Sequence, residues 1–181
     1  MKLKTKLISS LLAFGALGSV VAIKPLQPVY CTPNNPSIQQ LQTSPATENC
    51  RASVLIEKNS KKVLCENNSH TKYPIASVTK LMTVLLTLEN VENNNISLED
   101  NVMVSKNASG MGGSQIFLDA DVEYKLGELL KSVIVCSAND SSVALAEYIA
   151  GSETNFVRAM NEKAKQLGMN DTNYVNCTGL P

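Results

Sequence analysis

The chain of 181 residues lacks an excess of either charge, because sixteen lysine and arginine residues balance sixteen aspartate and glutamate residues. No basic cluster follows the first few residues. This balance argues against a protein that binds nucleic acid or an anionic membrane surface. Hydrophobic residues make up 44% of the sequence and charged residues 18%, which is ordinary for a globular chain of about one domain.

Closely spaced cysteine pairs are also lacking, since none of the five cysteines has a partner at the Cys-x-x-Cys spacing of zinc sites and redox pairs. We expect buried free thiols rather than any particular disulfide. The chain has a single histidine, His70, in a polar stretch typical of the surface. A serine enzyme built from this sequence would need a lysine as its base. The cysteines are Cys31, Cys50, Cys65, Cys136 and Cys177.

The beginning of the chain has the pattern of a secretory signal. Residues 1–6 are rich in lysine, and residues 7–23 form an apolar run. Cleavage after Ala22 or after Cys31 would suit the preference for small residues, and we favour Cys31 because two prolines keep the intervening segment extended. The alternative is an uncleaved anchor, although a run of about 17 residues is short for a spanning helix.

We therefore divide the chain into a signal peptide (residues 1–31), a linker (residues 32–50) and a folded domain (residues 51–181). The linker is rich in Pro, Asn, Gln, Ser and Thr and has few apolar residues. This organisation predicts a protein that is secreted through its signal peptide and acts in the cell envelope.

The folded part alternates β-prone and helical patterns. The runs at 52–57 and 61–66 flank a three-residue turn and predict an antiparallel hairpin. Apolar spacing predicts a helix that runs to about Glu89 and is buried on most sides. Further helices are expected at 125–135, at 140–150 with Asp140 as its cap, and at 153–167, with a short strand at 101–104.

A candidate nucleophile and its base stand in residues 74–83, which read Pro-Ile-Ala-Ser-Val-Thr-Lys-Leu-Met-Thr. Ser77 and Lys80 are three residues apart, so both would lie on one face where the apolar helix opens. A lysine that is kept neutral is able to take the proton of a serine nucleophile. Ser69 and Lys72 repeat this spacing, but only the second copy follows a proline and precedes an apolar helix.

A second candidate group is Ser137-Ala138-Asn139, in a short connection between two expected helices. Its hydroxyl suits a proton relay, and its amide suits the binding of a substrate amide. Ser105-Lys106-Asn107 has the same spacing. We prefer the copy at 137 because apolar helices on both sides would hold it rigidly beside a cleft.

In the order and spacing of several blocks, the chain resembles the serine-type D-alanyl-D-alanine carboxypeptidases of peptidase family S11, which are low-molecular-mass penicillin-binding proteins. The resemblance runs from about Ala52 to Pro181. Ser-x-x-Lys and Ser-x-Asn belong to the motif set of penicillin-binding proteins. The matching blocks are residues 74–83, 112–118 (Gly-Gly-Ser-Gln-Ile-Phe-Leu), 137–147, 160–169 and 176–180 (Asn-Cys-Thr-Gly-Leu).

The resemblance implies an α/β (α+β) fold of the penicillin-binding-protein and β-lactamase type, an antiparallel sheet flanked by a helical cluster. It implies that Ser77 attacks the bond between the terminal D-alanines of a peptidoglycan stem peptide, with Lys80 as its base. Ser137 would relay the proton, and Asn139 would bind the peptide. Water would then hydrolyse the acyl-enzyme. Penicillins would acylate the same serine, and no metal or organic cofactor is implied.

The third motif of this family, Lys-Thr-Gly, lies on a strand downstream of the block at 176–180. Cys177-Thr178-Gly179 is not a copy of it, because the lysine is missing. We therefore expect an incomplete domain without its later strands or a membrane anchor after them. The later strand supplies one of two oxyanion donors, and loss of one donor typically costs about 10²- to 10³-fold in rate. The 181 residues alone are accordingly expected to be poorly active or inactive.

Two other functions stay open from the sequence. A class A β-lactamase-like hydrolase shares Ser-x-x-Lys and Ser-x-Asn but needs a further glutamate for deacylation, and the blocks at 112–118 and 160–180 favour the carboxypeptidase. The other alternative is a non-catalytic envelope protein that binds stem peptides through a vestigial cleft.

Overall fold

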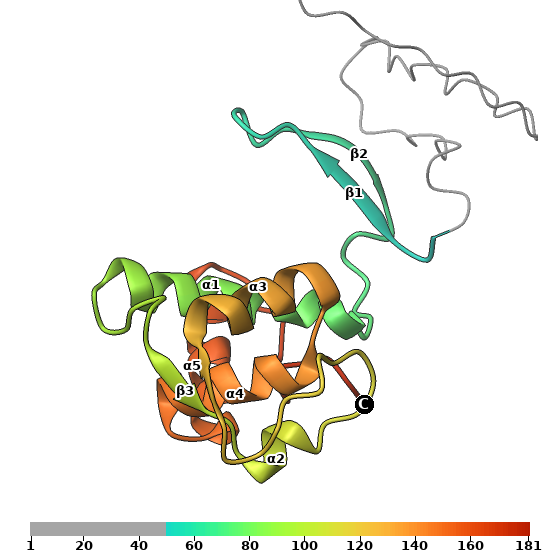
Figure 1. Ribbon diagram of the computed structural model, residues 1–181. Coiled ribbons are helices and arrows are strands. Elements are labelled where there is room, and N and C mark those ends of the chain that lie inside the picture. The colour runs from blue at the N-terminus through green and yellow to red at the C-terminus, as the bar shows by residue number, and fades with distance from the viewer. Residues whose placement is uncertain (1–49) are drawn as a thin grey trace, which may run out of the picture. The chain divides into compact units, whose positions relative to one another are not determined.

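The computed structural model describes residues 50–181, so the predicted signal peptide and nearly all of the predicted linker lie outside the described residues. The chain divides into two compact units between Asn67 and Asn68. The described part of the first unit is a β-hairpin, and the second unit contains the helices (Figure 1). Among residues 50–181, no helix is long and apolar enough to cross a membrane.

The hairpin forms where the sequence predicts it. Strands β1 (Ser53–Ile56) and β2 (Val63–Asn67) pair antiparallel, with an irregularity in register near the end of β1. The Glu57 carboxylate accepts hydrogen bonds from the backbone N–H groups of Asn59 and Ser60 in the connecting turn. Hydrogen bonds from Ser60 and Asn59 favour the ionised carboxylate and lower the pKa of Glu57 to about 2.

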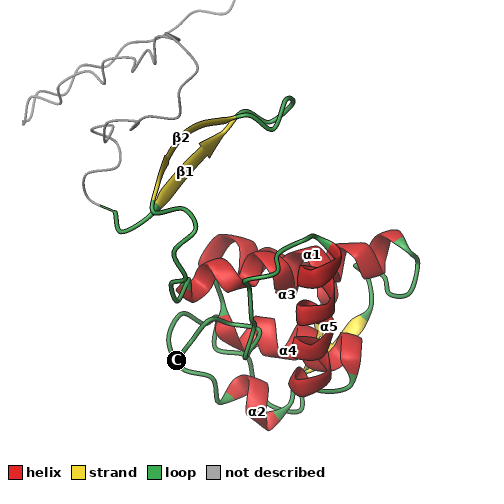
Figure 2. Ribbon diagram, turned by 180° about the vertical axis from the view of Figure 1, so that it is seen from behind, coloured by secondary structure: helices red, strands yellow, loops and turns green. Residues whose placement is uncertain are grey.

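Helix α4 (Asn139–Ala150) is the centre of the second unit and contacts all the other α-helices of that unit (Figure 2). Residues 139–146 are all buried, and their small alanine and serine side chains let neighbouring helices approach closely. The surrounding elements are the 3-10 helix η2 (Ala76–Thr79), α1 (Lys80–Glu92), β3 (Asn101–Met103), α2 (Lys106–Ser109), β4 (Glu123–Lys125), α3 (Leu126–Cys136) and α5 (Glu153–Gln166).

Helices α3 and α5 each bury one apolar stripe against this centre. The buried positions of α3 follow the i, i+3, i+4, i+7 spacing of an amphipathic helix, and those of α5 recur every four residues. The predicted helices at 125–135 and 153–167 are thereby confirmed to within a residue or two. The buried apolar side chains are Leu126, Leu129, Leu130 and Val133 on α3, and Phe156, Met160 and Ala164 on α5.

Helix α1 is buried or half-buried on most sides, as expected, and is exposed along one narrow stripe. Met82, Thr83 and Leu86 lie inside the unit, whereas Leu81 is 69% exposed and Leu88 is also exposed. Leu81 and Leu88 are seven residues apart and therefore lie on one stripe of the helix, while all the positions between them are buried or half-buried. The prediction of burial on most sides is therefore confirmed for the part of the chain that the structure describes.

The mixed α/β class is confirmed. The sheet structure of residues 50–181 consists of two separate two-stranded antiparallel ladders, β1 with β2 and β3 with β4. The β3 strand matches the predicted strand at 101–104. The ladder of β3 and β4 belongs to the helical unit, and its Val102 side chain is fully buried.

Candidate active site

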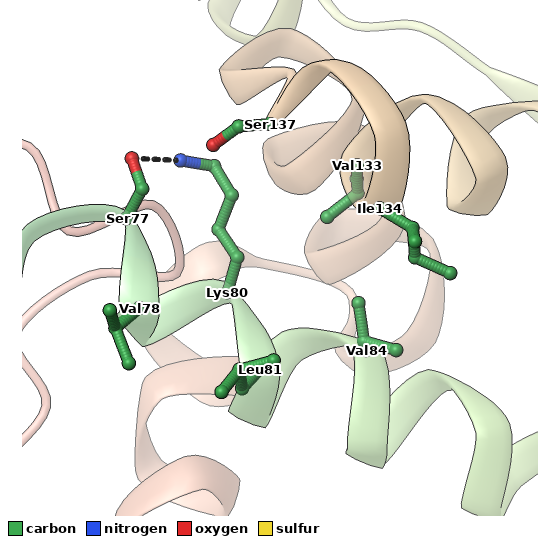
Figure 3. Close-up of a pocket in the computed structure, with 8 residues that line it drawn as sticks. All are labelled: Ser77, Val78, Lys80, Leu81, Val84, Val133, Ile134 and Ser137. Carbon is green, nitrogen blue, oxygen red and sulfur yellow. Dashed lines mark hydrogen bonds between the residues drawn. The ribbon is translucent and has the colours of Figure 1, made fainter. Parts of the chain in front are cut away.

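The serine and lysine of residues 74–83 lie in adjoining turns. Ser77 is in η2, and Lys80 is the first residue of α1. Ala76, which precedes the serine, has a φ of 46°, a left-handed conformation that is uncommon for a residue other than glycine. The Lys80 Nζ lies 3.2 Å from the Ser77 Oγ, within hydrogen-bond distance (Figure 3). The two groups are therefore in reach for proton transfer.

Lys80 is a buried lysine whose amine makes polar contacts with Ser77 and Thr178. The residue is 4% exposed, and its Nζ donates a hydrogen bond to the Thr178 carbonyl oxygen at 2.8 Å. Burial lowers the pKa of Lys80, because the charged ammonium loses solvation, while the Cys177 thiol nearby acts in the opposite direction. A lowered pKa increases the fraction of neutral amine, which is the form that accepts a proton.

Three of the four predicted site residues line one pocket of about 500 Å³: Ser77, Lys80 and Ser137. Their hydroxyl and amine groups point toward one another at the pocket (Figure 3). A small polar group beside an apolar wall is typical of sites that bind small molecules or peptides. The apolar wall consists of Val78, Leu81 and Val84 from η2 and α1, with Val133 and Ile134 from α3.

Ser137 occupies the junction between α3 and α4, as predicted. It is the residue after α3 and has φ 55° and ψ 38°, a left-handed conformation. A single left-handed residue that is not glycine costs about 1–2 kcal/mol, and the two flanking helices hold it there. The bend turns the Ser137 side chain into the pocket, while Asn139 begins the next helix.

Asn139 is buried beside the pocket and holds the loop that contains Gly112. Its Nδ2 donates to the Gly112 carbonyl at 2.7 Å, and its backbone N–H donates to the Ser114 carbonyl at 2.7 Å. Its Oδ1 is buried without a hydrogen-bond partner. A buried acceptor without a partner typically costs about 1–3 kcal/mol, so this oxygen is suited to accept an N–H from a ligand.

The Asp140 side chain also binds this loop, which corrects the expectation that Asp140 caps α4. The helix begins one residue earlier, at Asn139, and has no side-chain cap. The Asp140 carboxylate accepts the backbone N–H of the next residue, Ser141, at 2.9 Å, and those of Ile116 and Leu118 in the loop at 3.1 and 3.2 Å. The residue between them, Phe117, has a φ of 59° and is exposed. The carboxylate thus stabilises a left-handed backbone next to the site.

Asp140→Asn is expected to loosen this loop. One Asp140 oxygen accepts from Ile116 and Leu118, and the other accepts from Ile116 and Ser141. An NH2 group in either position therefore deprives the Leu118 N–H or the Ser141 N–H of its partner. Loss of a buried hydrogen-bond partner costs about 1–3 kcal/mol, which corresponds to roughly 10- to 100-fold faster exchange of these amides with deuterium. Asp100→Asn, which alters a loop carboxylate bound to Ser97 and Tyr148, is the matched control. Equal exchange in both variants would contradict this role for Asp140.

The rival copies of the two motifs have structural roles. Lys72 forms an exposed ion pair with Asp171 at 2.8 Å. Ser105 is the N-cap of α2, and its side chain accepts a hydrogen bond from the Ala108 backbone N–H at 3.0 Å.

His70 is exposed, as expected. Within residues 50–181, no group of three or more histidine, cysteine, aspartate or glutamate side chains is arranged to hold a metal ion.

Solved structures of penicillin-binding proteins share this fold. A D-alanyl-D-alanine carboxypeptidase DacD from Francisella tularensis has a TM-score of 0.72 and 33% identity over 74% of this chain and 32% of that chain. Penicillin binding protein 5 from Haemophilus influenzae also has a TM-score of 0.72, with 32% identity over 77% of this chain and 41% of that chain. The described fold is therefore of the penicillin-binding-protein class.

The family follows from sequence comparison. The model of the D-alanyl-D-alanine carboxypeptidase family, peptidase family S11, matches residues 39–181, and the chain belongs to this family. D-alanyl-D-alanine carboxypeptidase DacF of Bacillus subtilis (strain 168) is 45% identical over 139 residues, which cover 77% of this chain and 36% of that protein. DacC of Escherichia coli (strain K12) is 36% identical over 78% of this chain and 37% of that protein. The chain thus spans little more than a third of the length of these relatives.

Proposed function

We propose that the protein is a serine-type D-alanyl-D-alanine carboxypeptidase, which removes the terminal D-alanine of peptidoglycan stem peptides through an acyl-enzyme. The observation that carries the proposal is the 3.2 Å separation between the Ser77 Oγ and the amine of the buried Lys80. The names of the relatives support the substrate class. The same serine would be acylated by penicillins, in agreement with the penicillin-binding structures that share the fold.

The first chemical step forms the acyl-enzyme. The neutral Lys80 amine takes the proton of the Ser77 hydroxyl while the Oγ attacks the carbonyl carbon of the penultimate D-alanine. The carbonyl oxygen becomes negatively charged. The Ser77 backbone N–H belongs to the opening of a helical segment, where N–H groups have no partner within the helix, and it suits this oxyanion.

The second step breaks the peptide bond and then frees the enzyme. The proton now on Lys80 passes through the Ser137 hydroxyl to the nitrogen of the departing D-alanine as the C–N bond breaks. A water molecule then gives a proton back along the same route and attacks the ester carbon, which releases the shortened peptide and restores Ser77. Asn139 binds the amide of the stem peptide through its unpartnered Oδ1.

Labelling of the full-length protein, meaning residues 1–181 together with any residues that follow them in the gene product, with a fluorescent penicillin tests this function. The label is expected to form a covalent adduct with the native protein and to be lost entirely in Ser77→Ala, because that variant has no nucleophile. Ser69→Ala, the serine of the rival motif, is the control and is expected to be labelled at the native rate. Labelling that persists in Ser77→Ala would contradict the assignment, and so would loss of labelling in Ser69→Ala alone.

The proposed substrate implies a location where peptidoglycan is made and remodelled. We propose that the protein acts in the cell envelope, outside the cytoplasm, after secretion through residues 1–31. Contact with the cytoplasmic membrane would come only from that segment or from an anchor outside residues 1–181. The family that matches residues 39–181 supports the location through its substrate class.

A further inference from the structure

The amine of Lys80 is held by a backbone carbonyl as well as by Ser77. The Thr178 carbonyl oxygen accepts its hydrogen bond at 2.8 Å in a buried environment, whereas the contact to the Ser77 Oγ is longer, at 3.2 Å. The carbonyl belongs to residues 176–180, a segment without regular secondary structure, which we call the strap. The direction of this carbonyl therefore depends on whatever fixes the strap.

The side chain of Asn176 forms hydrogen bonds with the backbone of the strap residues that follow it. Its Oδ1 accepts hydrogen bonds from the backbone N–H groups of Thr178 and Gly179, at 3.2 and 2.6 Å. Its Nδ2 donates to the Leu180 carbonyl oxygen at 2.7 Å. One amide side chain thus satisfies backbone groups of three successive residues, as in the turns that asparagine commonly stabilises.

One peptide unit connects Asn176 to Lys80. The Thr178 carbonyl and the Gly179 N–H belong to the same planar unit, in which they point in opposite directions. Asn176 binds the N–H at one end, and Lys80 binds the carbonyl at the other. Because the unit is planar and rigid, fixing its N–H also fixes the direction of its carbonyl.

Other contacts attach the strap to the helices at its neighbouring residue. The Thr83 hydroxyl of α1 donates to the Cys177 carbonyl at 2.8 Å, and the Cys177 N–H donates to the Glu153 carboxylate of α5 at 3.0 Å. These bonds hold Cys177 in place but do not contact the peptide unit that carries the Thr178 carbonyl. The hydrogen bond to the N–H of that unit comes from Asn176.

The ionisable groups around the amine do not replace this carbonyl. Burial, followed by the nearby Glu153, raises the pKa of the Cys177 thiol, so the thiol is neutral at physiological pH. The Glu153 carboxylate is bound to the Cys177 N–H, and the Asp140 carboxylate is bound to the loop at 116–118. Ser137, which faces the amine from the end of α3, is uncharged at any ordinary pH.

We propose that Asn176 is a positioning residue, which orients the Thr178 carbonyl so that the Lys80 amine presents its lone pair to the Ser77 hydroxyl. In the neutral amine, one N–H donates to the carbonyl, and this leaves the lone pair free to accept the serine proton. Asn176 touches neither substrate nor nucleophile and acts only through the peptide unit between Thr178 and Gly179. This role rests on the proposed function and adds a third component to the Ser-x-x-Lys and Ser-x-Asn groups.

The acylation rate of the full-length protein by a fluorescent penicillin, measured under single-turnover conditions, tests the role. Asn176→Ala is expected to lower the limiting acylation rate about 10- to 100-fold, which is the effect of a small misplacement of a reacting group. The penicillin concentration that gives half of the limiting rate is expected to change little. Asn176→Asp keeps the acceptor oxygen and is expected to restore the rate to within about fivefold of the native value.

Asn161→Ala is the matched control. Asn161 is also an asparagine that braces a backbone segment, since its side chain donates to the Tyr174 carbonyl and accepts from the Tyr174 N–H, each at 2.8 Å. Its removal is expected to lower thermal stability but to leave the acylation rate within about twofold of native. Equal slowing in Asn161→Ala and Asn176→Ala, or a native rate in Asn176→Ala, would overturn the role of Asn176.

A second measurement separates this inference from the proposed function. Lysine labelled with 13C at Cε reports the pKa of Lys80 by NMR, and the Lys80 signal is assigned by its loss in Lys80→Met. The Thr178 carbonyl favours the ammonium form, so Asn176→Ala is expected to lower this pKa below the native one, while Asn161→Ala leaves it unchanged. An unchanged or raised pKa in Asn176→Ala overturns the positioning role, even if the protein is not acylated at all. A protein that is not acylated but shows the lowered pKa instead contradicts only the carboxypeptidase function.

Discussion

Lys80→Met is expected to reduce acylation of the full-length protein by a fluorescent penicillin about 10²- to 10⁴-fold, the usual contribution of a general base. Methionine has nearly the length of lysine and suits a buried position, so the pocket keeps its shape while the proton acceptor is lost. The rate of label incorporation measures the effect. The matched control is Lys72→Met, which removes the exposed lysine of the rival motif and its ion pair with Asp171. A native rate in Lys80→Met would exclude Lys80 as the base.

The same substitution is expected to change how stability depends on pH. In the native protein the pKa of Lys80 is lowered from its ordinary value of 10.5, so the unfolded chain binds more protons than the folded one between the two values. The free energy of unfolding therefore rises with pH across that interval because of this group. Lys80→Met lacks this dependence, so its stability relative to the native protein is greatest below the lowered pKa of Lys80 and declines as the pH rises toward 10.5. Urea unfolding at several pH values measures the difference. If the stability of Lys80→Met relative to the native protein increased with pH, the lowered pKa of Lys80 would be contradicted.

The helices of the second unit could be predicted because their apolar residues repeat at helical spacing. The stripe on α3 and the repeat on α5 predict each helix to within a residue or two, and the structure buries them together. The pattern of α1 is less informative, since apolar residues such as Leu81 lie on its exposed side. Spacing predicts a helix, but it does not by itself determine how many neighbours surround that helix.

The side chains of the candidate site could be predicted because nucleophilic catalysis by a serine requires a hydroxyl group and a nearby base. A serine and a lysine one turn apart are visible in the sequence, and so is the short connection that contains Ser137. Their separation of 3.2 Å and the burial of Lys80 required the structure, because burial depends on the strap and on α3 packing against the start of α1.

The backbone partners of the site could not be predicted in this way. The Thr178 carbonyl holds Lys80, and every residue type has a carbonyl, so no residue type marks this role. Asp140 has the residue type of a helix cap and lies near the start of a helix, yet its carboxylate binds a loop more than twenty residues earlier in the chain. A contact across that separation depends on tertiary packing. A local role at the start of the helix could be predicted for Asp140, and one of its oxygens does accept the adjacent Ser141 N–H at 2.9 Å, but its contact with the distant loop could not.

Gly179→Ala is expected to destabilise the protein by at least about 4 kcal/mol, or to prevent folding, because the strap packs backbone to backbone against the start of η2. Gly179 has a φ of 80°, and a Cβ added there would overlap the Ala76 carbonyl and lie 2.9 Å from the Thr79 Oγ1. Neither obstacle is the end of a flexible side chain, so the clash is relieved only if the strap moves away. Such a movement would withdraw the Thr178 carbonyl from Lys80.

Gly151→Ala separates the two causes of this effect. Gly151 has a φ of 74°, but a Cβ there would meet nothing within 4 Å, so the variant carries only the cost of a left-handed alanine, about 1–2 kcal/mol. The difference in the free energy of unfolding between the two variants, measured by urea denaturation, is the cost of the clash. A difference near zero would mean that the strap does not press against Ala76 in solution. A large difference, with loss of penicillin labelling in Gly179→Ala alone, would mean that this close backbone contact fixes the positions of Ser77, Lys80 and the strap relative to one another.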